Sequence, residues 1–272
     1  MLRSASVLAI AVMSFCGMFY SAAVYAQVSQ LDQIQIAPPM RQVQPPSPTA
    51  STAELEKQGD DLRSRKAYLD AIDYFQAALA KSPDNASVIN KIGISELMLQ
   101  RYKEAGKSFE QAIKKNRKFA EAYNNLGVVQ YERRKYRAAV KQYKKALEIS
   151  SDSASFYSNL GAAYFAGKKF EQASQAYAKA MQLDPSIFEH TSHTGIAAQM
   201  ASPEDRAHYD FVLAKLYAKM GDSDHSLEYL RKAMEDGYKK VDDALTDPVF
   251  AELRKDARFT ELMKSKPTAI PE

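Results

Sequence analysis

The sequence repeats four glycines at a constant interval of 34 residues. Two alanine columns and two aromatic columns keep the same interval. A fixed period of this length is typical of a helix-turn-helix unit whose apolar face is covered only when a neighbouring unit stacks on it. The columns are Gly59, Gly93, Gly127 and Gly161; Ala71, Ala105, Ala139 and Ala173; Ala78, Ala112, Ala146 and Ala180; Tyr68, Tyr102, Tyr136 and Phe170; and Phe75, Phe109, Tyr143 and Tyr177.

The columns place small and large side chains at fixed offsets from one another. Where two helices cross closely, only glycine or alanine lets the backbones approach, and an aromatic ring from the adjacent turn fills the remaining space. We therefore assign these columns to helix packing and not to a binding site.

The units resemble tetratricopeptide repeats. The late proline of that family is present as Pro83 and Pro185, whereas Arg117 and Ser151 replace it in the second and third units. The resemblance implies an all-α fold, a right-handed superhelical solenoid of stacked antiparallel helix pairs. It places four regular units at 52–85, 86–119, 120–153 and 154–187, with the bulky fourth-position residues Leu55, Ile89, Tyr123 and Tyr157.

A fifth, degenerate unit is predicted at 207–240, where Tyr217, Gly221 and Ala233 keep the register. Atypical end units are expected in repeat arrays. The segment 241–265 resembles the amphipathic tail that follows many such arrays, which implies a cap over the last exposed apolar face.

An insertion at 188–206 separates the fourth and fifth units. At its end, Ser202 and Pro203 predict the start of a helix, because serine caps helices well and proline is favoured at the first helical position.

The N-terminus has the pattern of an export signal, with a positive start, an apolar run and small residues before a cleavage point. We predict a signal peptide at 1–26 and export across the inner membrane, to the periplasm or as a secreted chain. The alternative is an uncleaved membrane anchor. The residues that carry the pattern are Arg3, the run from Val7 to Phe19, Val24, Ala26 and Gln27.

Residues 27–51 are rich in glutamine, proline and serine. Such a composition predicts an extended, disordered linker that tethers the array. The alternative is a proline-rich ligand for an aromatic groove.

Charge is distributed unevenly along the chain. Residues 101–148 carry fourteen Lys and Arg against five Asp and Glu, whereas 149–272 carry fifteen against nineteen. Most of the basic residues of 101–148 fall on second helices or turns, hence on the convex side. A solvated face is one interpretation, and a face that binds anionic lipid or an acidic partner, as in an envelope-tethered assembly factor, is the other. Nucleic acid is not expected, since no recognition motif is present.

The resemblance also indicates where a partner binds, since first-helix positions line the concave side of such arrays. Amide side chains there can hold the backbone of an extended peptide, and neighbouring apolar side chains supply contact area. The leading hypothesis is therefore a protein-protein interaction scaffold with a protein or peptide partner in this groove. The predicted partner-binding residues are Asn90, Lys91, Leu97, Asn124, Asn125, Tyr131, Asn159 and Phe165.

The sequence shows no catalytic constellation. It has no glycine-rich phosphate loop and none of the common hydrolase or metalloprotease motifs, and Cys16 is its only cysteine. We therefore expect no enzymatic activity, no cofactor and no metal. The competing hypothesis is a metal-binding or enzymatic protein centred on His190, His193 and His208, three histidines close together in the sequence.

Overall fold

The computed structural model describes residues 43–188 and 202–267. The chain divides into two compact units, 1–45 and 46–272, and every described helix lies in the second. The predicted signal peptide, the linker as far as residue 42 and the insertion from 189 to 201 lie outside the described residues. None of the described helices is long and apolar enough to cross a membrane.

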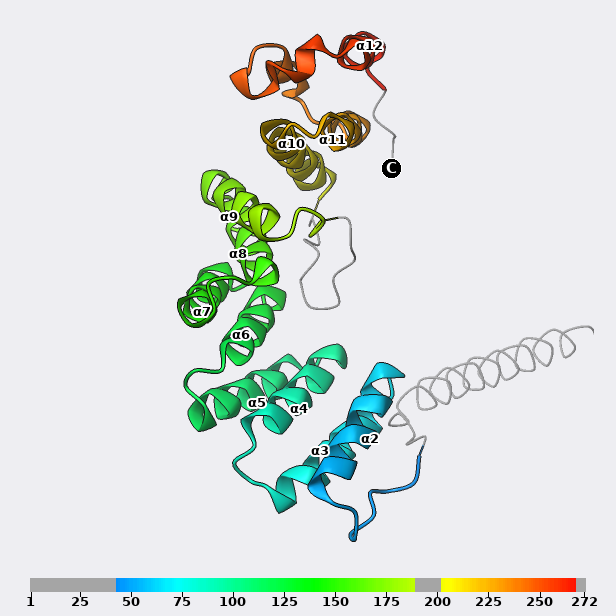
Figure 1. Ribbon diagram of the computed structural model, residues 1–272, viewed down its shortest axis with the longest axis vertical. Helices are drawn as coiled ribbons and strands as arrows, with labels where there is room; N and C mark the ends of the chain where they lie inside the picture. Colours follow the sequence, from blue (N-terminus) through cyan, green and yellow to red (C-terminus); the bar gives the residue numbers. More distant parts are fainter. Residues whose placement is uncertain (1–42, 189–201, 268–272) are drawn as a thin grey trace, which may run out of the picture. The chain divides into compact units, whose positions relative to one another are not determined.

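The described residues form eleven α-helices and three short 3-10 helices, without a strand (Figure 1). Consecutive α-helices pack as pairs, and within 52–187 the second helix of one pair packs on the first helix of the next. The predicted all-α solenoid of stacked helix pairs is thereby confirmed. The pairs are α2 (Thr52–Ser64) with α3 (Tyr68–Lys81), α4 (Ala86–Met98) with α5 (Tyr102–Lys115), α6 (Ala120–Glu132) with α7 (Tyr136–Ile149), α8 (Ala154–Ala166) with α9 (Phe170–Leu183), and α10 (Pro203–Met220) with α11 (Ser223–Glu235).

The glycine column lies against the aromatic column, as the sequence predicts. A Cβ atom placed on Gly127 would come within 2.5 Å of Cε1 of Tyr143, and the other three column glycines face the rings of Phe75, Phe109 and Tyr177 in the same way. These rings are fully buried. The glycines therefore set how closely the two helices of each pair approach.

The turn between the two helices of each pair has the same hydrogen bonds in all five pairs. In the third pair, the amide of Lys135 donates to the carbonyl of Gln130, and the amide of Arg134 donates to the carbonyl of Tyr131. A turn of this kind places one residue in the left-handed region. That residue is Lys66, Gln100, Arg134, Lys168 and Gly221 in the successive pairs.

The helix α10 starts where the sequence predicts. The hydroxyl of Ser202 accepts a hydrogen bond from the amide of Asp205 at 3.1 Å, and Pro203 is the first helical residue. The helix therefore begins four residues before the start of the predicted fifth unit at 207.

Residues 241–265 pack against the last helix pair. They form the 3-10 helices η1 (Val241–Leu245), η2 (Pro248–Phe250) and η3 (Leu253–Lys255) and the helix α12 (Ala257–Ser265). Phe250, Phe259 and Leu262 are buried in one cluster with Phe211 of α10 and Leu230 of α11. This segment covers apolar surface of the fifth pair.

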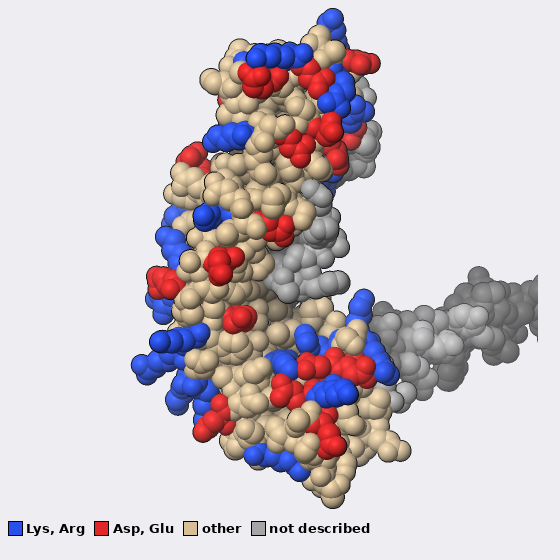
Figure 2. Space-filling view, in the orientation of Figure 1, with Lys and Arg blue, Asp and Glu red and all other residues tan. Residues whose placement is uncertain are grey.

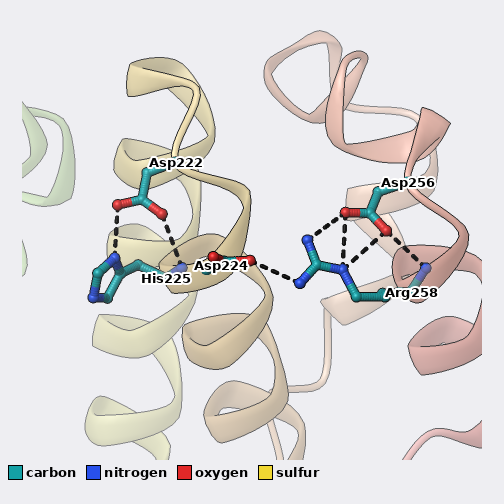
Figure 3. Close-up of polar contacts among 5 residues, drawn as sticks. All are labelled: Asp222, Asp224, His225, Asp256 and Arg258. Carbon is teal, nitrogen blue, oxygen red and sulfur yellow. Dashed lines mark hydrogen bonds and ion pairs between the residues drawn. The ribbon is translucent and has the colours of Figure 1, made fainter.

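Polar contacts join α12 to α11 at the protein surface (Figure 3). The carboxylate of Asp256 caps α12 by accepting from the amide of Arg258 at 2.9 Å. The guanidinium of Arg258 donates to Asp256 and, at 2.7 Å, to Asp224 of α11. Asp222 caps α11 and also bonds the ring of His225. The bond between Arg258 and Asp224 is the one of these contacts that joins the terminal segment to the fifth pair.

Candidate partner-binding face

A row of side-chain hydrogen bonds joins the first helices of the four regular units. In each bond, the sixth residue of one unit donates to the fifth residue of the preceding unit, 35 positions earlier. The row thus continues from α2 through α4 and α6 to α8. Its members are Lys91 Nζ with Glu56 Oε1 at 2.6 Å, Asn125 Nδ2 with Asn90 Oδ1 at 3.1 Å, and Asn159 Nδ2 with Asn124 Oδ1 at 2.9 Å.

The ionic end of this row involves one lysine and two carboxylates. Lys91 Nζ lies 2.6 Å from both Glu56 and Asp60. Burial disfavours the charge of Lys91, but the bonds to Asp60 and Glu56 outweigh it and raise the pKa of Lys91. Lys91 of the second unit is therefore charged and joined to two carboxylates of the first unit.

The structure buries five of the eight predicted partner-binding residues. The other three, Lys91, Leu97 and Asn125, are half-buried. A side chain enclosed between repeats offers a partner little surface. The buried residues are Asn90, Asn124, Tyr131, Asn159 and Phe165.

Asn125 retains hydrogen-bonding capacity toward a partner. Its amide nitrogen donates to Asn90, and its oxygen accepts from Asn124 at 3.3 Å. A side-chain amide has two donor hydrogens and two acceptor lone pairs. One donor and one lone pair of Asn125 are therefore unused by these bonds.

The two buried aromatic residues of the predicted groove pack on rings from neighbouring helices. Tyr131 lies 5.5 Å from Tyr136, measured between ring centroids, and burial raises its pKa to about 12. Phe165 lies 5.1 Å from Phe170 and 5.7 Å from Tyr209 of α10. Phe165 thus belongs to the contact between the fourth and fifth pairs.

His208 lies among the same rings. Its ring centroid is 4.2 Å from that of Phe170 and 5.4 Å from that of Tyr238, and burial lowers its pKa. His190 and His193 lie outside the described residues, so a metal site there stays a prediction. Within 43–188 and 202–267, no three His, Cys, Asp or Glu residues are grouped as metal ligands.

The basic residues of 101–148 lie on second helices and turns and are exposed, as expected from the repeat register. Figure 2 shows Lys and Arg side chains gathered beside α7. Lys115 pairs with Asp84, and Lys145 lies 5.6 Å from the ring centroid of Tyr123. The exposed cations include Lys103, Lys107, Lys114, Arg133, Arg134, Arg137, Lys141 and Lys144.

Sequence reasoning missed Glu56 and Asp60, the carboxylates that hold Lys91. A signal for Glu56 was available, since a glutamate and a lysine 35 residues apart occupy the same two repeat positions as the paired asparagines. The left-handed residues of the turns were also missed, because one sequence does not show the backbone conformation of a turn.

Comparisons with known proteins agree with this architecture. The family profile described as TPR repeat matches residues 96–133 and 130–167, and two profiles described as tetratricopeptide repeat match 154–187 and 211–235. A search of curated proteins finds no match.

Several solved structures are similar to this chain. MamA 41-end from Desulfovibrio magneticus RS-1 is 17% identical, with 74% of this chain and 100% of that chain covered and a TM-score of 0.50. A crystal structure of MamA is 22% identical, with 68% and 96% covered and a TM-score of 0.47. TTC0263, a thermophilic TPR protein in Thermus thermophilus, is 20% identical, with 75% and 98% covered and a TM-score of 0.48. Together with the helix pairs and their glycine columns, the profile matches show that this chain contains tetratricopeptide repeats.

Proposed function

We propose that this chain is a non-enzymatic scaffold that binds a protein or peptide partner along its first helices. The observation that carries the proposal is the row of bonds between units, at a constant offset of 35 residues. This row holds equivalent positions of α2, α4, α6 and α8 in register. Repeat positions held in register form a regular surface along which an extended peptide can lie.

The accessible groups beside the row suit a peptide. Asn125 has a donor and an acceptor available for a peptide backbone, and Leu97 is half-buried. Met98, the last residue of α4, is 53% exposed. A methionine at such a place adapts to different apolar side chains. The non-enzymatic part of the proposal rests on the repeat architecture, since arrays of this kind serve as interaction modules.

Replacing Met98 with glutamate is expected to weaken the binding of peptides along the first helices about tenfold, equivalent to about 1.4 kcal/mol. The added charge would have to be desolvated against the peptide, while the exposed position keeps the fold intact. We would select peptides from a random displayed library on the wild-type chain and compare their dissociation constants by fluorescence anisotropy.

Leu245→Glu supplies the matched control. Leu245 is 48% exposed in η1, outside the first helices, so the same chemical change there should leave the dissociation constants unaltered. Equal losses for the two variants, or no loss for Met98→Glu, would contradict binding along the first helices.

The proposal includes export of the chain, for which residues 1–26 supply the sequence argument. The small residues Val24 and Ala26 favour cleavage before Gln27. Intact-mass spectrometry of the protein from fractionated cells should find a chain beginning at Gln27 outside the cytoplasm. A species that retains Met1 would point to an anchor, and a species confined to the cytoplasm would contradict export.

A further inference from the structure

We propose a second binding surface, with residues other than the row of bonded side chains on the first helices, that takes an acidic peptide segment with a bulky apolar side chain. It lies on the turn edge, which we define as the turns 65–67, 99–101, 133–135 and 167–169 between the helices of each regular pair. Its centre is a pocket of about 540 Å³ where the third and fourth turns meet between α7 and α8.

The pocket combines an apolar floor with a cationic rim. Tyr136, Val140, Ala163 and Tyr164 supply the apolar side chains of its lining. The lining contains no carboxylate. It contains four exposed cations, Arg134, Lys135, Arg137 and Lys169.

These four cations have no carboxylate partner among the described residues. Some other cations of the repeats are neutralised: Lys91 pairs with Glu56 and Asp60, and Lys168 pairs with Asp205. Four like charges that line one pocket repel one another. An anionic ligand would relieve that repulsion.

The turns of this edge place long polar side chains on backbone in the left-handed region. Arg134 has a φ of 56°, Lys66 of 63° and Lys168 of 57°, in the left-handed region that favours glycine. The fifth pair places Gly221 at the same position, with a φ of 78°. The regular units thus keep long polar side chains where the fifth unit has the unstrained residue.

The size and the lining of the pocket favour one kind of anion. Its volume is in the range that encloses a ligand group, and its floor would accept a leucine or phenylalanine side chain. A phosphate or a lipid headgroup would use the cations but leave the floor exposed. A peptide that carries Asp and Glu around one large apolar residue satisfies both the rim and the floor.

The first test is a synthetic peptide of Asp and Glu with a central leucine, labelled with fluorescein and titrated with the full chain. We expect Arg134→Glu together with Arg137→Glu to weaken its binding at least about tenfold. Lys103→Glu with Lys107→Glu on α5 changes the net charge equally and should have a much smaller effect. A peptide with serine in place of leucine should also bind more weakly.

Arg134→Gly supplies a second readout of opposite sign. Glycine relieves the left-handed backbone, so the urea midpoint should rise, while loss of the guanidinium weakens peptide binding. If Arg134 were only structural, its replacement by glycine would leave the affinity for the peptide unchanged. Met98→Glu should leave this peptide's affinity unchanged, which separates this surface from the first-helix face.

Three outcomes would overturn the proposal. Equal weakening by the two charge-reversal pairs would reduce the effect to overall charge. Indifference to the leucine would remove the role of the pocket floor. Binding of phosphatidylglycerol vesicles or inorganic phosphate, lost in Arg134→Glu with Arg137→Glu while the peptide does not bind, would assign the cations to a different ligand.

Discussion

Replacing Gly127 with alanine is expected to destabilise the array by about 2 to 3 kcal/mol, the upper part of the range for overpacked cores. The new Cβ would lie 2.5 Å and 2.7 Å from two ring carbons of Tyr143. That ring is fully buried in α7, so it has no open space to move into. Urea denaturation followed by circular dichroism would measure the loss.

Gly106→Ala is the matched control for this prediction. Gly106 lies inside α5, and a Cβ there would meet only Cγ1 of Val129 at 3.6 Å, an ordinary contact. Because alanine favours helix more than glycine does, this change should stabilise the array by about 1 kcal/mol. Effects of the same sign at the two glycines would contradict the assigned roles of the columns.

The contrast between Gly127, which faces a buried ring, and Gly106, which does not, explains why the fold could be predicted from the sequence. The contact between glycine and aromatic ring occurs four times at one interval, so a single register satisfies all four units. The first helices of the regular units consequently begin 34 residues apart, at Thr52, Ala86, Ala120 and Ala154. Each unit confirms the register of the others.

The fifth unit depends on local signals instead. Its first helix begins at Pro203, where Ser202 caps the chain, because a strong cap determines a helix start independently of the repeat. The repeat register alone placed the start of that unit at 207. The repeat period therefore predicts where a unit lies, whereas a capping residue predicts where its helix begins.

The partner-binding residues could be predicted only by position. Asn90, Asn124 and Asn159 occupy places that face a groove in the repeat pattern, and asparagine there is compatible with either a ligand or a neighbouring repeat as its partner. Which of these holds depends on the distance between successive first helices. The structure brings Asn159 within 2.9 Å of Asn124 and leaves its side chain fully buried. Asn125 belongs to the same row but is only half-buried, so a partner can reach its side chain.

Phe165 shows the same ambiguity with a larger energetic consequence. The sequence places it with Leu97 and Tyr131 as apolar contact area for a partner, but its side chain is 1% exposed. It lies against Phe170 in its own pair and against His208 and Tyr209 of the fifth pair. An insertion separates these two pairs in sequence, so contacts of this kind are what hold them together.

Phe165→Ala is therefore expected to destabilise the array by about 3 to 5 kcal/mol, the usual cost of removing a buried phenylalanine ring. The loss should appear in urea denaturation, and the fifth pair should lose hydrogen-exchange protection before the first, because repeats are coupled mainly to their neighbours. Leu97→Ala, at the equivalent but half-buried position of α4, should cost clearly less. If Phe165→Ala instead keeps full stability and weakens peptide capture, the ring is part of an open groove and its assignment to the core fails.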